Sequence, residues 1–221
     1  MFFGKHSDDE TVVALIAAAL RRDISFGTLR PDAKLKIGQL RTRYGGSNHS
    51  VREALRILSS EGLVAAEAQR GFRVASATQA DLKDITRLRV EIERLGLGWS
   101  IENGGTAWEA EVIAAHHGLR RAEDQVASNA DDLTALEWDE AARTFYAALM
   151  SGCGSPRLLG MQARLFDQSR RIRLTALRES RVNFTARQTR QAELRDAAVG
   201  RDQPTALALL TREIEGELAG T

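Results

Sequence analysis

An apolar stripe near residue 50 constrains the fold of this chain more than any other sequence feature. Four residues repeat with the spacing of one helix face: Val51, Ala54, Leu55 and Leu58. Gly62 ends the segment, and residues 63–66 and 72–75 then have the pattern of two short strands around a polar turn. A helix over residues 48–61 with such a stripe must bury it against further helices.

Two helices are expected before this one. Residues 9–25 place apolar side chains at helical spacing, and Gly27 ends that segment. A second, short helix over residues 36–44 is broken by Gly45 and Gly46. Three helices followed by a two-stranded hairpin are the elements of a winged helix-turn-helix domain, which we place at residues 1–76.

The pattern changes after residue 76, where no strand-like alternation remains. Breaks rich in Gly, Asn, Ser and Pro separate six helical segments, at residues 79–103, 106–128, 131–151, 156–178, 183–200 and 203–219. The sequence therefore predicts a mainly α protein, in which an all-helical bundle of about six helices occupies residues 77–221.

Basic side chains are concentrated in the first of these domains. The whole chain has a net charge of only +1, but residues 28–76 contain nine Arg and Lys against four Asp and Glu. A basic block on a nearly neutral chain is typical of a module that binds a polyanion. The alternative is an ordinary solvated charged surface, and charge alone does not separate the two.

The third helix carries short polar side chains and arginine opposite its apolar stripe. Ser47 is placed to cap the helix, whose free N–H groups attract phosphate. Arg52 is long enough for a bidentate contact with guanine in the major groove. We expect contacts with double-stranded DNA from this helix and from the basic hairpin tip, through Ser47, Asn48, His49, Ser50, Arg52, Arg70 and Gly71. The alternative is an amphipathic surface helix that a hairpin happens to follow.

These residues resemble a known family of DNA-binding domains. The string Val51-Arg52-Glu53-Ala54-Leu55, with Glu61-Gly62-Leu63-Val64 and Arg70-Gly71-Phe72-Arg73-Val74, is similar to the GntR-type winged helix. The resemblance implies the same DNA contacts in the third helix and the wing. The family usually has a sequence close to Val-Ser-Arg-Thr-Pro before this string, whereas residues 46–50 here are Gly-Ser-Asn-His-Ser. Asn48 in place of arginine would favour adenine over guanine.

The second domain resembles the helical FCD effector domain of the FadR-like branch. The matching pieces are Asp81-Leu82 with Arg89 and Glu93, Trp108 to Glu111, Phe145 with Leu149, and the break at residues 152–156. The resemblance implies a homodimeric transcriptional regulator, commonly a repressor of a metabolic operon. It also implies a small-molecule effector such as an organic acid or an acyl thioester.

Many domains of this family hold a divalent metal with one Asp and three His. By the resemblance, these positions fall on Ala142, Tyr146, Gln191 and Glu213, none of which is histidine. The chain has four histidines, and two of them, His116 and His117, are adjacent on one helix and point about 100° apart. We therefore predict that the protein has no metal and no other cofactor.

A remodelled effector pocket is expected where the family has its metal site. Its candidate residues are Arg89, Arg143, Tyr146, Gln191 and Glu213. Arg89 is also spaced to pair with Glu93 one helical turn away, as a structural partner. The alternative is a vestigial pocket in a dimeric DNA-binding protein that has no effector.

A helical-bundle enzyme is the alternative from another functional class. The sequence lacks a phosphate-binding loop, a dinucleotide fingerprint, a nucleophile elbow and a Glu-x-x-His pair. Cys153 is the single cysteine, which excludes an intramolecular disulfide and fits a reducing compartment. With no signal-peptide pattern and no apolar run of membrane-spanning length, we expect a cytoplasmic protein that is not an enzyme and does not bind membranes.

Overall fold

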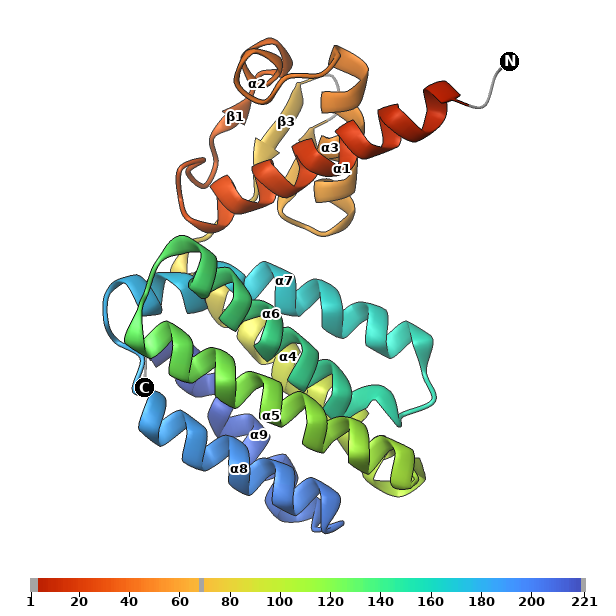
Figure 1. Cartoon of the computed structure of the whole chain (residues 1–221), viewed down its shortest axis with the longest axis vertical. Coiled ribbons are helices and arrows are strands. Elements are labelled where there is room, and N and C mark those ends of the chain that lie inside the picture. The colour runs from red at the N-terminus through yellow and green to blue at the C-terminus, as the bar shows by residue number, and fades with distance from the viewer. Residues whose placement is uncertain (1–3, 68–69, 220–221) are drawn as a thin grey trace. The chain divides into compact units, whose positions relative to one another are not determined.

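The N-terminal third of the chain folds into helices and a small sheet. The computed structural model describes residues 4–67 and 70–219. Helices α1 (Gly4–Ser25), α2 (Ile37–Tyr44) and α3 (Asn48–Ser60) precede the hairpin strands β2 (Val64–Glu67) and β3 (Gly71–Val74) (Figure 1). All five elements predicted from the sequence of this region are therefore present.

A third strand joins the predicted hairpin. Strand β1 (Lys34–Leu35) pairs antiparallel with β3, with Lys34 opposite Arg73 and Leu35 opposite Phe72, so the strand order is β1-β3-β2. The wing is thus a three-stranded sheet with β3 at its centre, not the two-stranded hairpin that we expected. A strand of two residues is too short to show alternation, which is why the sequence pattern does not reveal it.

The apolar stripe of α3 is fully buried. Its residues have 0% exposure and pack in one core with residues of α1, α2 and the sheet, among them Ile16, Leu20, Leu40, Val64 and Val74. The turn between α2 and α3 depends on Gly46, whose φ is +76°, and a Cβ at that position would lie 2.8 Å from Cδ1 of Ile16. The positive φ and the nearby Ile16 side chain therefore both favour glycine at this turn.

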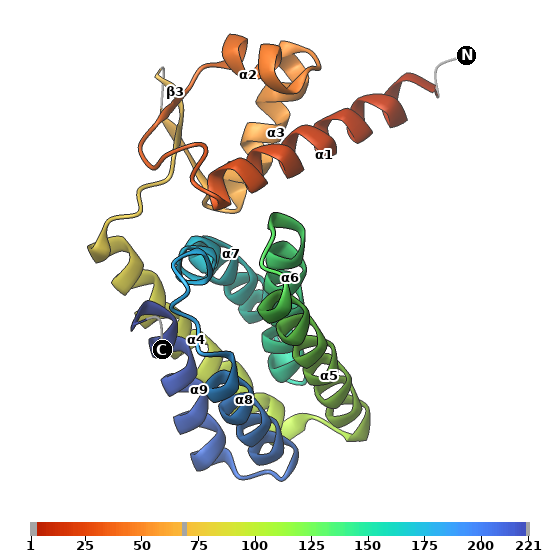
Figure 2. The same ribbon diagram turned by 60° about the vertical axis from the view of Figure 1, so that its left-hand side comes forward.

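All elements of the described part of the chain after the wing are helices. They are α4 (Gln79–Asn103), α5 (Thr106–Ser128), α6 (Asp132–Ser151), α7 (Pro156–Arg178), α8 (Phe184–Val199) and α9 (Gln203–Ala219) (Figure 2). Their number and bounds agree with the predicted segments to within one residue. The chain divides into two compact units between Asp81 and Leu82, so the first turn of α4 groups with the N-terminal unit. We call the second unit the helical unit.

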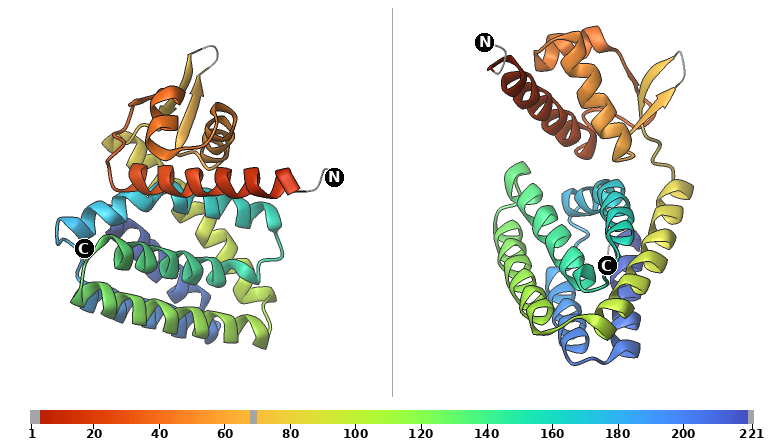
Figure 3. Two further views of the ribbon diagram at one scale, coloured as in Figure 1. Left: turned by 45° about the horizontal axis from the view of Figure 1, so that its top comes forward. Right: turned by 90° about the vertical axis from the view of Figure 1, so that its right-hand side faces the viewer.

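Most helices of the helical unit pack in pairs. Helix α5 packs on α6 and on α8, α6 packs on α7, and α8 packs on α9. The α5–α6 and α8–α9 pairs lie side by side in both Figure 2 and Figure 3. Asp131 forms a capping box at the start of α6, and Ser155 caps α7 just before Pro156. This packing brings side chains of α5 to α9 into one interior.

Candidate functional sites

The N-terminal end of α3 presents polar side chains to solvent. Ser47 is the N-cap, and its hydroxyl oxygen accepts a hydrogen bond from the backbone N–H of Ser50 at 3.0 Å, as the sequence predicts. Ser47, Asn48, His49 and Arg52 are exposed, and the first turn contains no acidic residue. The positive end of the helix dipole and these side chains therefore face outward together.

Ser50 differs from its neighbours on α3. It is only 2% exposed, and its hydroxyl lies 2.8 Å from the hydroxyl oxygen of Ser47. The side chain is turned toward the domain interior and supports the cap. The DNA contact expected for Ser50 thus has no support in the structure.

Polar contacts hold α2 on α1 beside this surface. Arg43 and Tyr44 both donate to the Asp23 carboxylate, at 2.5 and 2.6 Å. Burial and the hydrogen bond to Asp23 raise the pKa of Tyr44 above its usual value, so its hydroxyl remains a neutral donor. These contacts fix the helix that supports α3 and leave Arg41 exposed at its end.

The wing brings one further basic group to the surface. Arg70 is exposed, and Gly71 next to it has a φ of +92°, which favours glycine at this point of the hairpin. Residues 68 and 69, at the turn itself, lie outside the described residues. Both wing residues predicted from the sequence are therefore placed at the end of the hairpin.

Three of the four positions implied by the family's metal site meet inside the helical unit. Glu213 of α9 accepts hydrogen bonds from the Tyr146 hydroxyl of α6 at 3.4 Å and from the Gln191 amide of α8 at 3.3 Å. All three side chains are buried. Ala142 is buried on α6 as well but has no polar side-chain atom.

Arginine side chains surround Glu213 at this point. The Nε of Arg190 donates to its Oε2 at 2.8 Å, and Nη2 of Arg187 lies 3.2 Å from its Oε1. Burial would lower the pKa of Arg187, but the Glu213 carboxylate raises it above its usual value, so the guanidinium stays charged. On its other side, Nε of Arg187 lies 3.6 Å from the carboxylate of Glu123, and burial raises the pKa of that carboxyl to about 6.

These residues do not fit a divalent metal. Burial raises the pKa of the Tyr146 hydroxyl well above its ordinary value, so it stays protonated, donates a hydrogen bond to Glu213 and is not available as an anionic ligand. A guanidinium already lies beside Glu213, and Ala142 has no ligand atom. Across residues 4–67 and 70–219, no group of three or more His, Cys, Asp or Glu side chains is placed to hold a metal ion.

A second buried ion network lies in the same unit. Arg89 donates to Glu93 at 2.8 Å and to Glu217 at 2.6 Å, and all three side chains are nearly inaccessible. The pairing of Arg89 with Glu93 one turn away is the one expected from their spacing. Arg173 binds Asp139 at 2.7 Å. Burial would raise the pKa of Asp139, but Arg173 and Arg170 hold it below the usual range.

Arg143 lies outside both networks. It pairs with Glu140 at 3.5 Å and with Asp167 at 3.3 Å on the surface of α6 and α7, where it lines an open groove with Gln162. The structure therefore places Arg143 away from the interior pocket to which we assigned it.

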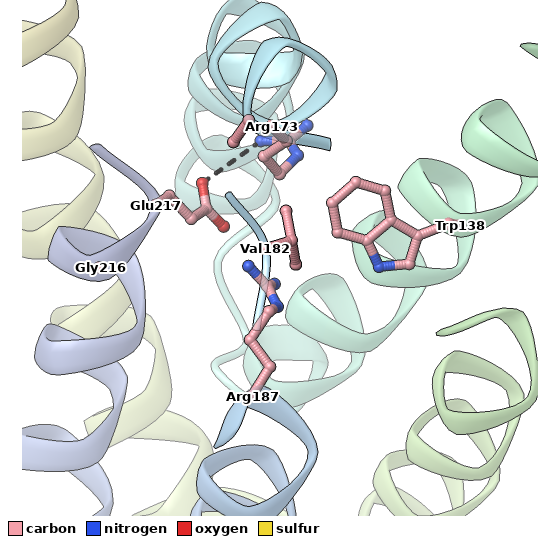
Figure 4. Close-up of a pocket in the computed structure, with 7 residues that line it drawn as sticks. Trp138, Arg173, Val182, Arg187, Gly216 and Glu217 are labelled. Carbon is pink, nitrogen blue, oxygen red and sulfur yellow. Dashed lines mark ion pairs between the residues drawn. The ribbon is translucent and has the colours of Figure 1, made fainter. Parts of the chain in front are cut away.

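A small cavity opens next to these networks, and sequence reasoning missed most of its residues. It is lined by Trp138, Arg173, Ala176, Val182, Arg187, Gly216 and Glu217 (Figure 4). A usable signal was present in α8, where Arg187 and Gln191 share one helical face with the buried Leu194 and Ala198. A charged residue on such a buried stripe needs an internal partner, which would have identified Arg187.

Comparison with known proteins assigns most of the chain to a family. The family model for bacterial regulatory proteins of the gntR family matches residues 13–74, and the FCD domain model matches residues 84–216. The chain belongs to the GntR family. GntR–FCD proteins are DNA-binding transcriptional regulators with an effector-binding C-terminal domain, and they are not enzymes. Among the described residues of this one, no helix has the length and apolar character needed to cross a bilayer.

Relatives of this GntR–FCD chain cover nearly all of its length. The HTH-type transcriptional repressor GlaR of Escherichia coli (strain K12) is 35% identical over 198 residues, which are 88% of this chain and 89% of that protein. The regulator BphR of Paraburkholderia xenovorans (strain LB400) is 34% identical over 203 residues, covering 90% and 81%. The solved structure of E. coli McbR/YncC has the same fold, with a TM-score of 0.70 at 22% identity and coverage of 94% and 95%.

Proposed function

We propose that this regulator reads its operator through the N-terminal end of α3, with Arg52 as the main base-discriminating residue. The observation that supports this most directly is the orientation of α3, whose apolar face is fully buried while Asn48, His49 and Arg52 are exposed. An arginine bound bidentately to guanine contributes about 1–3 kcal/mol of discrimination. Arg70 and Gly71 of the wing then contact the flanking backbone or minor groove.

The experiment is a selection of bound sequences from a pool of random duplexes, at moderate salt and with excess non-specific competitor. We expect a pseudo-palindromic operator, and Arg52→Ala should weaken its binding by about tenfold to a hundredfold. The matched control is Arg121→Ala, which removes an exposed arginine from α5 and should leave affinity unchanged. Absence of any sequence preference, or a preference that Arg52→Ala leaves intact, would contradict the proposal.

A homodimer follows from the way such operators are read, because two half-sites about one helical turn apart require two-fold symmetry in the protein. Helix α4 offers a surface for a second copy, since Leu88 and Leu95 are each 45% exposed and Trp99 is 37% exposed along one stripe. Their separations of seven and four residues are those of a helix–helix seam. Leu95→Glu should therefore lower the dimer fraction in sedimentation and weaken operator binding.

The regulatory part of the proposal concerns the interior of the helical unit. We propose that a small organic acid binds there without a metal ion and releases the protein from DNA, so that the chain represses a metabolic operon in the cytoplasm. The relative GlaR is named a transcriptional repressor, which supports repression as the direction of control. The Tyr146–Gln191–Glu213 cluster with Arg187 beside it supports metal independence. The second candidate is a regulator with a vestigial pocket, whose support is the small size of the cavity.

A further inference from the structure

Helices α4 and α7 touch in the helical unit and run in opposite directions. Nη1 of Arg89 donates to the hydroxyl oxygen of Ser169 at 3.1 Å. Farther along α4, a Cβ on Gly96 would lie 2.8 Å from Cδ2 of Leu158. Between these two contacts the residue numbers rise along α4 and fall along α7, so the helices are antiparallel. Their outer sides therefore form one surface.

The middle of this surface is apolar. On α4, Leu88 and Leu95 are each 45% exposed, and Trp99 is 37% exposed. On α7, Met161 is 52% exposed. Around each helix, these positions come next after the ones through which α4 and α7 touch. The exposed apolar side chains of the two helices therefore line one common seam.

Charged side chains border this seam, and their sign differs between the two helices. Three exposed carboxylates lie beyond the leucines on α4: Asp84, Glu91 and Glu102. Three arginines at intervals of seven residues lie beyond the methionine on α7: Arg157, Arg164 and Arg171. We call the seam and these six charged residues the α4–α7 face. It has an acidic edge on α4 and a basic edge on α7.

Charges of the opposite sign on the same helices point elsewhere. Asp167 is the single acidic residue in the sequence of α7, and it pairs with Arg143 of α6 at 3.3 Å. Lys83 and Arg87 of α4 lie farther around that helix, where they line a groove with Glu215 of α9. The two edges of the α4–α7 face thus keep their opposite signs.

Two of these charges have the unfavourable sign for the helix that carries them. Glu102 lies in the last turn of α4, and Arg157 lies in the first turn of α7. The helix dipole disfavours an acidic group at a C-terminus and a basic group at an N-terminus. The dipoles of α4 and α7 therefore do not account for these two side chains, which favours a partner outside the subunit.

Glu102 and Arg157 also lie at the same height on the α4–α7 face. Glu102 is thirteen residues after Arg89, and Arg157 is twelve residues before Ser169. Because the helices are antiparallel, both lie about 18–20 Å from the Arg89–Ser169 contact in the same direction. A two-fold rotation about an axis parallel to the helices keeps this height and exchanges the two edges.

We propose that the α4–α7 face is self-complementary, so that α4 of each subunit packs on α7 of its partner around such an axis. The acidic residues Glu102, Glu91 and Asp84 then lie opposite Arg157, Arg164 and Arg171 of the partner subunit, in that order. The inference rests on the homodimer of the proposed function and specifies which helix covers the leucines of α4. An axis across the helices would instead set α4 on α4, with carboxylates facing carboxylates.

The test exchanges charges across this contact. Dimerisation of the full-length protein is measured by sedimentation at low salt and without DNA. Glu102→Arg and Arg157→Glu should each weaken it about tenfold, because each variant brings like charges together twice in the symmetric dimer. The double variant restores opposite charges and should dimerise within about threefold of the wild-type protein. The matched control Glu193→Arg reverses an exposed charge on α8 and should have no effect.

A stability measurement separates pairing from folding. Each single variant gives its helix the charge that the dipole favours, so the helical unit of the monomer should be at least as stable as in the wild-type protein. Urea unfolding followed by tryptophan fluorescence, at a concentration where every variant is monomeric, measures this. A weaker dimer with an undiminished urea midpoint therefore reports the interface.

Two results would overturn the inference. They are single variants that dimerise as tightly as the wild-type protein, and a double variant that dimerises no better than the singles. If Leu95→Glu still lowers the dimer fraction in either case, the α4 surface of the proposed function stands and only its pairing with α7 fails. A protein that stays monomeric at all concentrations would contradict both.

Discussion

Three arginines in each unit of this regulator differ sharply in their environments. In the N-terminal unit the core is apolar, and Arg41, Arg52 and Arg70 are exposed. In the helical unit Arg89, Arg173 and Arg187 are buried at 1–4% exposure and bind internal carboxylates. Arginine side chains are thus available to an external polyanion in one unit, and they pair with buried carboxylates in the other.

This difference predicts different sensitivities to mutation. An apolar core loses stability in proportion to the volume removed, because dispersion and hydrophobic contacts are non-directional. A buried ion network loses more when one partner is removed, because the other charge is left without compensation. All three tryptophans, Trp99, Trp108 and Trp138, lie in the helical unit, so their fluorescence reports the unfolding of that unit alone.

The largest effect is expected for Asp139→Ala. Asp139 is fully buried and accepts from both Arg173 and Arg170. Its loss leaves these two guanidinium groups with only more distant carboxylates, at 3.6 to 3.9 Å. We expect the helical unit to lose about 3–5 kcal/mol of unfolding free energy, measured by tryptophan fluorescence in urea. The control Asp124→Ala removes an exposed carboxylate of α5 and should cost at most about 0.5 kcal/mol. A loss of similar size in both variants would contradict the expected sensitivity of the buried ion network.

Leu55→Ala tests the apolar core of the N-terminal unit. Leu55 has no exposed surface, and its truncation should cost about 2–5 kcal/mol through lost contacts and a cavity. Because this unit has no tryptophan, circular dichroism should show an earlier transition while the fluorescence midpoint stays unchanged. If the fluorescence midpoint moves by the same amount, the two units unfold as one and the comparison fails.

Arg70→Ala should change DNA binding without changing stability. Arg70 is exposed in the wing, and as a phosphate contact it should weaken binding to all duplexes alike and reduce the slope of affinity against salt by about one. Fluorescence anisotropy over a salt series measures this. The urea midpoints should not move. An effect confined to one operator sequence would instead indicate that Arg70 reads bases.

The smallest effect concerns the pH dependence of the helical unit. Burial, assisted by Arg195, lowers the pKa of His116 from 6.5 to about 4. As pH falls through about 6.5, the unfolded chain takes up this proton while the folded chain does not, so stability declines until about pH 4. Above that window the contribution is constant.

His116→Gln should remove this part of the acid sensitivity. Urea unfolding at about pH 7.5 and about pH 5 should show a smaller difference in the variant than in the wild-type protein. His117→Gln, at an exposed position on the same helix, is the control. If stability falls equally between these two pH values in His116→Gln and in the wild-type protein, groups other than His116 cause the pH dependence.

Much of the fold could be predicted from the sequence, because its information is local. The stripe from Val51 to Leu58 and the breaks at Gly45, Gly62 and Pro156 fix where helices begin and end. Strand β1 was not predicted, because a strand of two residues is too short to show an alternating pattern. Its pairing with β3 is a long-range contact that local patterns do not encode.

The interior site was less accessible to sequence reasoning. Alignment to the family identified Tyr146, Gln191 and Glu213, which do meet, but it could not show that Arg187 lies beside them. We wrongly assigned Arg143 to the interior pocket. A charged side chain close to a pocket residue on a helix can point toward the interior or toward the surface, and the sequence alone does not separate the two. Whether an arginine is buried depends on partners from other helices, and only the packed structure supplies them.

The position of β3 has a mechanical consequence for the wing. β3 is hydrogen-bonded on both sides, to β1 and to β2, and the chain leaves it at Val74 for the segment that leads to α4. A pull on that segment is therefore applied to the middle of the sheet rather than to an edge that could peel away. Because β3 pairs with both neighbours, we expect β1 and the hairpin that bears Arg70 to move together with it.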